Sequence, residues 1–259
     1  MKTDVICDTN IWYYLGDGTI DPNSLKDYSL IATFYNFEEL ITTPNNLTNF
    51  QQVRRAAKAI VNYSSKQYLE NAFLYLANQI TPNYEDTKYG YNLGIRNWAE
   101  IRRMAALDDS FQLTPELKAE YEKNAINRGK QGQQVAQIEN DFVTNVKAHS
   151  KKVWKTNSSK YFKERFKGIL LELNDYLKMF SDGRIEMQGK HIKQVELFLT
   201  AFLQFSKNTE VAKWVVKPND AYDLYNLIYV KPGSKYFTRE NRWKNLIAEA
   251  GLDHYLLHA

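Results

Sequence analysis

The chain has 259 residues, of which 44% are hydrophobic and 25% charged, and its formal net charge at pH 7 is only +4. This balance is ordinary for a globular protein with one large domain or two small ones. The single cysteine, Cys7, excludes an intramolecular disulfide framework and a cysteine-rich zinc site. No apolar run approaches the ~20 residues of a membrane span, and the first residues lack the apolar segment of a signal peptide. We therefore expect a cytoplasmic protein with no membrane partner.

The first part of the chain alternates between short apolar runs and helical patterns. Residues 5–10 predict a buried strand that ends on Asp8 and Asn10, and residues 29–33 predict a second strand. A helix over 34–41 follows directly. Another helix is expected to begin at Thr43-Pro44, and the apolar spacing over residues 65–80 predicts one more.

The middle of the chain, from about residue 85 to 207, has an almost wholly helical pattern. Its expected helices are 99–107, 114–128, 131–155, 158–180 and 190–205, with a joint at Gly129. A mixed pattern then returns, with strands over 213–216, 235–238 and 254–257 and helices over 221–228 and 240–250. Strands at both ends with helices between them predict an α/β fold with a parallel sheet flanked by helices.

Four acidic residues stand where such a sheet holds its functional groups. Asp8 ends the first strand, Glu39 follows the second, Asp220 begins a helix, and Glu240 follows the strand 235–238. Because strand ends and helix starts share one edge of a parallel sheet, these carboxylates are expected to converge. Converging carboxylates repel unless a cation neutralises them, and Mg²⁺ or Mn²⁺ suits an all-oxygen site.

Each of these acids also has a plainer interpretation, which the sequence leaves open. Asp8 can cap the helix that follows it. Asp220 can be an ordinary charge at a helix N-terminus, and Glu240 can simply begin its helix.

Two neighbouring acids qualify the pattern. Asp223 lies one helical turn after Asp220, so it is either a secondary ligand or a surface acid. Glu38 and Glu39 point about 100° apart on a helix, so only one of them is expected to reach the site. We assign Glu39 to the site and expect Glu38 to face solvent.

Four segments in chain order resemble the motifs of the PIN-domain nucleases. They are V-I-C-D-T-N-I-W, L-I-A-T-F-Y-N-F-E-E-L, P-N-D-A-Y-D-L-Y and Y-F-T-R-E-N-R-W. The resemblance implies a three-layer α/β/α fold with a central parallel sheet, formed by residues 1–84 and 208–259. Residues 85–207 would then be a mostly helical insertion. The last motif usually ends its acidic series with Asp, whereas this chain has Glu240.

Carried over by position, the resemblance also assigns roles. It implies Asp8, Glu39, Asp220 and Glu240 as catalytic and metal-binding residues, and we add Asp223 as a further metal ligand. Asn10 and Thr238 would be supporting polar residues. The family activity is metal-dependent cleavage of RNA or of structured DNA.

Residues 147–167 contain eight basic residues and one acidic residue, with aromatic residues between them. Basic groups neutralise phosphates and aromatic rings stack on unpaired bases, so this segment is a candidate nucleic-acid interface. A solvated helix face with its own core aromatics explains the same pattern. The candidate nucleic-acid-binding residues are Lys151, Lys152, Trp154, Lys155, Lys160, Tyr161 and Arg165, and Arg96, Arg102 and Arg103 are expected to help guide the strand.

The sequence thus favours a Mg²⁺- or Mn²⁺-dependent endoribonuclease acting on RNA. Two alternatives remain: a PIN-like module that binds nucleic acid or protein without turnover, and a structure-specific DNA nuclease. By analogy with the family, an antitoxin-like protein partner is a further option.

Overall fold

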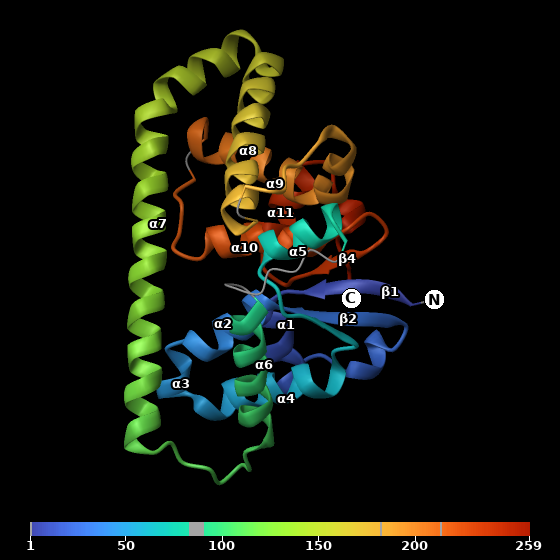
Figure 1. Cartoon of the computed structure of the whole chain (residues 1–259), viewed down its shortest axis with the longest axis vertical. Helices are drawn as coiled ribbons and strands as arrows, with labels where there is room; N and C mark the ends of the chain where they lie inside the picture. Colours follow the sequence, from blue (N-terminus) through green and yellow to red (C-terminus); the bar gives the residue numbers. More distant parts are fainter. Residues whose placement is uncertain (1, 83–90, 182, 213) are drawn as a thin grey trace.

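The computed structural model describes residues 2–82, 91–181, 183–212 and 214–259, and these are mostly helical around one small sheet (Figure 1). The sheet has the strands β1 (Thr3–Cys7), β2 (Tyr28–Thr33), β3 (Lys66–Tyr68) and β4 (Lys235–Phe237). Their order is β3-β2-β1-β4, and every neighbouring pair is parallel. The predicted α/β class with a parallel sheet is therefore confirmed.

In the described part of the chain, a helix follows each strand. In order, the helices are α1 (Thr9–Gly16), α2 (Phe34–Thr42), α3 (Asn45–Thr48), α4 (Phe50–Tyr63), α5 (Ala72–Ile80), α6 (Tyr91–Ala106), α7 (Pro115–Thr156), α8 (Ser158–Phe180), α9 (Glu196–Glu210), α10 (Asp220–Asn226) and α11 (Asn241–Glu249). Short 3₁₀ helices cover Pro22–Leu25, Gly189–Val195, Leu227–Tyr229 and Asp253–Tyr255.

The sheet separates two apolar cores because successive strand residues point to opposite faces. Val5 and Cys7 of β1 are fully buried in one core, with side chains from α1, α4 and α6. Ile6 is buried in the other core, with side chains from α5, α9 and α11. Helices thus cover both faces of the sheet, and Cys7 is a buried small hydrophobe, as expected.

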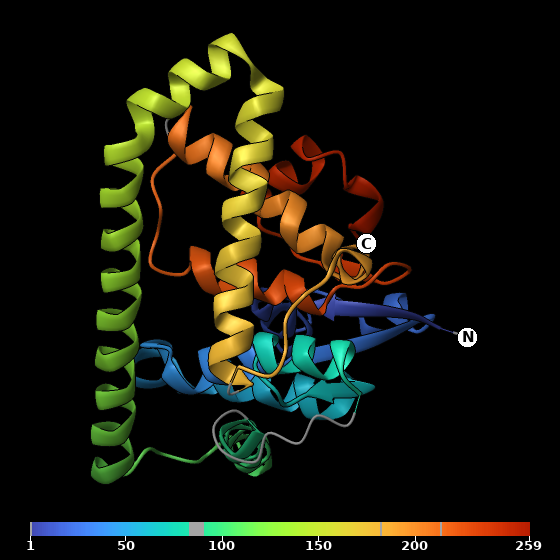
Figure 2. The same cartoon turned by 45° about the horizontal axis from the view of Figure 1, so that its top comes forward.

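The long helix α7 connects two distant parts of the molecule. It runs along one side, in green at the left of Figure 1, and Figure 2 shows the same course from another direction. Its first half contacts α2 and α3, and its second half contacts α8 and α9. The predicted start is confirmed, since the Thr114 hydroxyl accepts from the Leu117 amide at 3.3 Å and Pro115 opens the helix. The predicted joint at Gly129 is wrong, because α7 continues through it.

Several other predicted boundaries are corrected. The helix expected over 65–80 is instead β3 followed by α5, which begins where the Asn71 side chain accepts from the amides of Phe73 and Leu74. Lys213 lies outside the described residues, and 214–216 form no strand. The strand expected over 254–257 is reduced to one parallel bridge between Tyr236 and Leu256.

The proposed division into residues 1–84 with 208–259, and an insertion over 85–207, stays a prediction, and its first boundary lies outside the described residues. What the structure describes is that α6 packs on α2 and α4, and that α9 packs on α10 and α11. The middle of the chain therefore adds side chains to both cores. In the described part of the chain, every helix is too short or too polar to cross a bilayer.

Candidate functional site

A cavity of about 370 Å³ lies at the edge of the sheet where the parallel strands end. All five predicted carboxylates line it, although they come from four separate segments of the chain. The lining residues are Asp8, Asn10, Tyr13, Glu39, Lys217, Pro218, Asn219, Asp220, Asp223, Glu240, Arg242 and Trp243. We call this space the acidic cavity.

Asp8 lies at the centre of a hydrogen-bond cluster between β1 and β4. One carboxylate oxygen accepts from the Thr9 amide at 2.7 Å, so Asp8 does cap α1. The other accepts from the Thr238 hydroxyl at 2.6 Å and from the Asn10 amide group at 2.7 Å. The hydroxyl of Thr238 also accepts from the Glu240 amide at 3.1 Å. Asn10 and Thr238 therefore support Asp8 directly, and the capping role coexists with the place in the cavity.

Glu38 and Glu39 diverge on α2 as the helical geometry predicts. Glu39 lines the acidic cavity. Glu38 does not simply face solvent as expected, because one of its oxygens lies 3.1 Å from a guanidinium nitrogen of Arg128 on α7. This ion pair crosses from α2 to α7, so Glu38 connects the two helices beside the site.

Asp220 and Asp223 face the acidic cavity from the first turn of α10. Asp220 is buried, and one of its oxygens accepts from the Lys217 amide at 2.8 Å and from the Arg242 guanidinium at 2.6 Å. Asp223 accepts from the indole nitrogen of Trp243 at 3.0 Å. Both carboxylates are thereby fixed by partners that flank the cavity.

Glu240 occupies the N-cap position of α11, but its side chain makes no capping hydrogen bond. The residue is exposed and lines the rim of the acidic cavity. It is the one member of the acidic set that is largely in contact with solvent.

Crowding and burial oppose ionisation in this cavity. Burial raises the pKa of Asp8 to about 7; the hydrogen bond from Thr238 opposes this rise, and the charge of Glu39 adds to it. Burial likewise raises the pKa of Asp223 well above its usual range, and the charges of Asp8 and Glu39 add to this effect. The pKa of Asp220 is raised by burial too. Such a set of carboxylates favours any cation that neutralises it.

The donor set fits a hard divalent cation, since it consists of carboxylate oxygens with amide and hydroxyl oxygens nearby. As the side chains stand, however, no three Asp, Glu, His or Cys residues in the described ranges are close enough together to form a metal cluster. The carboxylates are instead held apart by Thr238, Arg242 and Trp243. Rotation of these side chains would be needed to bring their oxygens onto one ion.

Several residues that line the cavity, above all Arg242 and Trp243, were not among the predicted site residues. Arg242 also donates to the Val215 carbonyl at 3.2 Å and lies over the Trp214 ring. Its signal was present, because Arg242 and Trp243 belong to the same Y-F-T-R-E-N-R-W segment as Glu240. Lys217 and Tyr13 had no comparable signal, since their approach depends on the loop before α10 and on the rotation of α1.

The basic segment forms the end of α7 and the start of α8, and its aromatic residues are largely used for packing. Tyr161 is only 2% exposed and contacts the Glu210 carboxylate at 3.2 Å. Arg165 pairs with the same carboxylate at 2.9 Å. Trp154 packs edge-on against Tyr161 and lies under the Lys207 ammonium group. Tyr161 therefore has no free ring face for a base, which corrects the expectation for this residue.

The lysines of the segment are better placed for a polyanion. Lys152, Lys155 and Lys160 are exposed, and Lys151 is half-buried. They lie far from the acidic cavity: Lys152 is twenty residues after Gly132, which touches the cavity loop, so the path along α7 is about 30 Å. A ligand that contacts both regions has to be an extended polymer.

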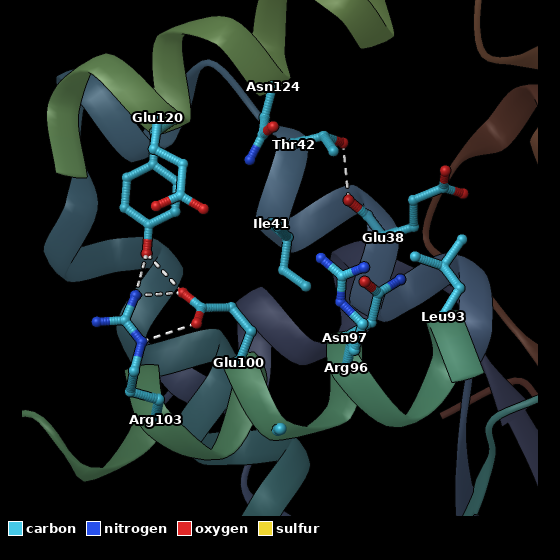
Figure 3. A pocket seen from close by; sticks show the side chains of 12 residues that line it. Glu38, Ile41, Thr42, Leu93, Arg96, Asn97, Glu100, Arg103, Glu120 and Asn124 are labelled. Carbon is cyan, nitrogen blue, oxygen red and sulfur yellow. Dashed lines mark hydrogen bonds and ion pairs between the residues drawn. The ribbon is translucent and has the colours of Figure 1, made fainter. Parts of the chain in front are cut away.

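The arginines expected to guide a strand lie near a larger cavity of about 530 Å³ between α2, α6 and α7 (Figure 3). Arg96 and Arg103 both line this cavity, and Arg103 is held by Glu100 with a 2.7 Å contact and by a second, shorter one. Arg102 instead lies near the Trp98 ring. Glu38, Glu100 and Glu120 also line the cavity, so its charge is mixed.

Comparison with known proteins adds no relative: the sequence matches no protein-family model, and neither a curated protein nor a solved structure matches it.

Proposed function

We propose that this protein is a PIN-like, metal-dependent endoribonuclease. The observation that supports it most is the convergence of Asp8, Glu39, Asp220, Asp223 and Glu240 on one cavity at the carboxyl edge of a parallel sheet. These residues are spread over more than 230 positions of the sequence. A three-layer PIN-like arrangement agrees with the parallel strand order and with the helices on both faces of the sheet.

The carboxylates are the residues that would hold Mg²⁺ or Mn²⁺. Such an ion, when bound, lowers the pKa of water and neutralises charge that develops on a phosphodiester. Asp8, with its pKa near 7, exchanges a proton easily at neutral pH, so cation binding there is expected to release protons. Thr238 and Asn10 keep Asp8 in place during this exchange.

The basic side chains at the cavity have a different role. Arg242 and Lys217 flank Asp220, and a guanidinium group binds phosphate oxygens well. We assign Arg242 to the backbone of a polynucleotide at the cavity and the exposed lysines of α7 and α8 to a more distant part of the same strand.

The direct test is cleavage of labelled single-stranded RNA and of DNA with the same sequence, each with Mn²⁺ and with EDTA. Metal-dependent cleavage of RNA alone supports the proposal. Preferential cleavage of structured DNA would instead support a structure-specific DNA nuclease that uses the same site. No cleavage of either polymer by metal-loaded protein would reject the enzymatic reading.

One observation favours a second candidate, a binding module without turnover. Arg242 already neutralises Asp220 at 2.6 Å, so part of the acidic set has a resident cation. A binding module predicts nucleic-acid or protein binding that is the same in Mn²⁺ and in EDTA and survives loss of the carboxylates.

A further inference from the structure

Helix α7 touches two of the four segments that carry the carboxylates, and it does so along a single stripe. The stripe consists of Arg128, Gly132, Ala136 and Asn140, spaced four residues apart and therefore on one face of the helix. Gly132 and Ala136 are buried. The contacts of this stripe fall on the loop and helix that carry Asp220 and Asp223, and on the helix that carries Glu39.

Asn140 holds the loop that leads to Asp220. Its side-chain nitrogen donates to the Val216 carbonyl at 3.0 Å, and its side-chain oxygen accepts from the Val216 amide at 3.1 Å. Both polar groups of one loop residue are thus satisfied by one side chain on α7. Val216 lies in neither a helix nor a strand. The two hydrogen bonds with Asn140 therefore satisfy the backbone groups that a secondary structure would otherwise pair.

Gly132 allows the loop to lie directly on the helix. A Cβ atom at Gly132 would be 2.9 Å from the Pro218 carbonyl oxygen and 3.0 Å from the Pro218 Cβ. Pro218 is two residues before Asp220 and itself lines the acidic cavity. Any side chain at position 132 therefore has to displace the backbone that carries Asp220.

Arg128 contacts α10 and α2, the helices that carry Asp223 and Glu39. Its guanidinium group lies 3.2 Å from the centroid of the Tyr222 ring and pairs with Glu38 at 3.1 Å. Tyr222 precedes Asp223 in α10, and Glu38 precedes Glu39 in α2. One residue of α7 thereby fixes the spacing between two carboxylate-bearing helices.

We propose that α7 is the positioning element of the acidic cavity, and that Asn140 and Gly132 are positioning residues for Asp220 and Asp223. The proposal deepens the proposed function, since the geometry it protects is that of the carboxylates. Part of the region 85–207 thereby supports the acidic cavity, although none of the four residues of the stripe lines it.

Two glycines of the same helix provide the main test. Gly132→Ala and Gly129→Ala both replace glycine inside α7, so both gain helix propensity. Only Gly132→Ala collides with Pro218, because a Cβ at Gly129 has nothing within 4 Å. Asn140→Ala forms a second pair with Asn145→Ala, since Asn145 is exposed on α7.

The first readout is Mn²⁺ affinity, measured by electron paramagnetic resonance on the full chain. We expect Gly132→Ala and Asn140→Ala to weaken binding by about 10-fold or more, as loss of a group that supports a metal ligand typically does. Gly129→Ala and Asn145→Ala should match the wild type. Equal affinities within both pairs would overturn the proposal.

A second readout does not require a metal. The indole N–H of Trp243 donates to Asp223, so its nuclear magnetic resonance signal reports the position of that carboxylate. We expect the signal to move in Gly132→Ala and Asn140→Ala and to stay in both controls. If the wild type binds no Mn²⁺, the proposed function fails, but this signal still decides whether α7 positions the cavity. An unmoved signal in all four variants overturns the positioning role.

Discussion

The acidic cavity and the basic segment at the α7–α8 junction carry opposite charges and are built in opposite ways. In the cavity, carboxylates from four segments of the chain are brought together, largely buried, and repel one another. At the junction, the basic residues are neighbours in sequence, and Arg165, which is partly buried, pairs at 2.9 Å with the buried carboxylate of Glu210 on α9. The rest of the basic residues there are mainly exposed.

Charge density along a sequence therefore does not by itself mark a site. Where charged groups find partners inside the protein, as Arg165 does, they stabilise packing. Where the fold brings like charges close together, as around Asp8, the charges repel one another, and a bound ligand of opposite charge can remove this repulsion.

Loss of the central carboxylate should have the largest effect. Asp8→Asn is expected to reduce metal-dependent RNA cleavage by on the order of 100-fold or more, because it removes a proposed metal ligand rather than a supporting group. RNA binding in a gel-shift assay should be little changed. The matched control is Asp4→Asn, at the start of the same strand, where the carboxylate pairs with Lys66 at the surface. Wild-type cleavage by Asp8→Asn would remove Asp8 from the mechanism.

The ion pair between Arg165 and the buried carboxylate of Glu210 should contribute strongly to the stability of the folded state. Arg165→Met leaves the Glu210 carboxylate, which is 1% exposed, without its cation. We expect the free energy of unfolding to fall by about 3–5 kcal/mol, measured by urea titration. Lys163→Met, an exposed change on the same helix, should have little effect. Similar losses in the two variants would contradict the assigned packing role.

Stability should depend on pH through Asp8. Its pKa rises from 3.8 in the unfolded chain to about 7 in the folded protein, so the folded state holds the proton more tightly. Stability is therefore expected to fall as pH increases from about 4 to 7 and to level off above that range. Asp8→Asn should raise the free energy of unfolding at pH 7.5 by roughly 2–4 kcal/mol in EDTA. Thermal unfolding at pH 5.0 and 7.5 checks this, and destabilisation by Asp8→Asn at pH 7.5 would refute the crowding argument.

Exposed lysines should contribute modestly and in a salt-dependent manner. The double change Lys152→Gln with Lys155→Gln is expected to reduce the slope of log affinity against log salt by about 1.4 for single-stranded RNA, since each phosphate contact contributes about 0.7. Fluorescence anisotropy at several salt concentrations measures it. Lys178→Gln, at the other end of α8, should leave the slope unchanged. An unchanged slope in the double variant would place the RNA elsewhere.

The smallest effect concerns the glycine that was expected to break α7. Gly129→Ala should stabilise the protein by about 0.5–1 kcal/mol, because alanine favours the helix and nothing lies within 4 Å of the added atom. Urea titration measures this gain. A loss of stability would contradict the conclusion that α7 accommodates alanine at this position as an ordinary helical residue.

Local patterns predicted the strands β1, β2 and β4 and the start of α7, because short apolar runs and the Thr114-Pro115 cap are encoded by neighbouring residues. They also placed Asp8, Glu39, Asp220, Asp223 and Glu240, which line one cavity. The continuity of α7 through Gly129 could not be predicted this way, since it depends on contacts with α2, α3, α8 and α9. The same holds for Tyr161, whose burial is decided by Glu210 from another helix.

Residues that act between elements were the hardest to find. Arg242 was passed over although it stands two positions after Glu240, because its ion pair with Asp220 exists only when α10 and α11 meet. The two hydrogen bonds between Asn140 and Val216 have no sequence signal either, since an asparagine on a polar helix has no distinguishing pattern.

The contact between Thr238 and Asp8 joins residues 230 positions apart. During synthesis on the ribosome, the strand that bears Asp8 emerges long before β4, which supplies Thr238, and contacts so distant in sequence are slow to form. A nascent chain that stops before β4 has the carboxylates of Asp8 and Glu39 but no completed cavity. Formation of the cavity therefore has to wait until β4 and the residues that follow it have been translated.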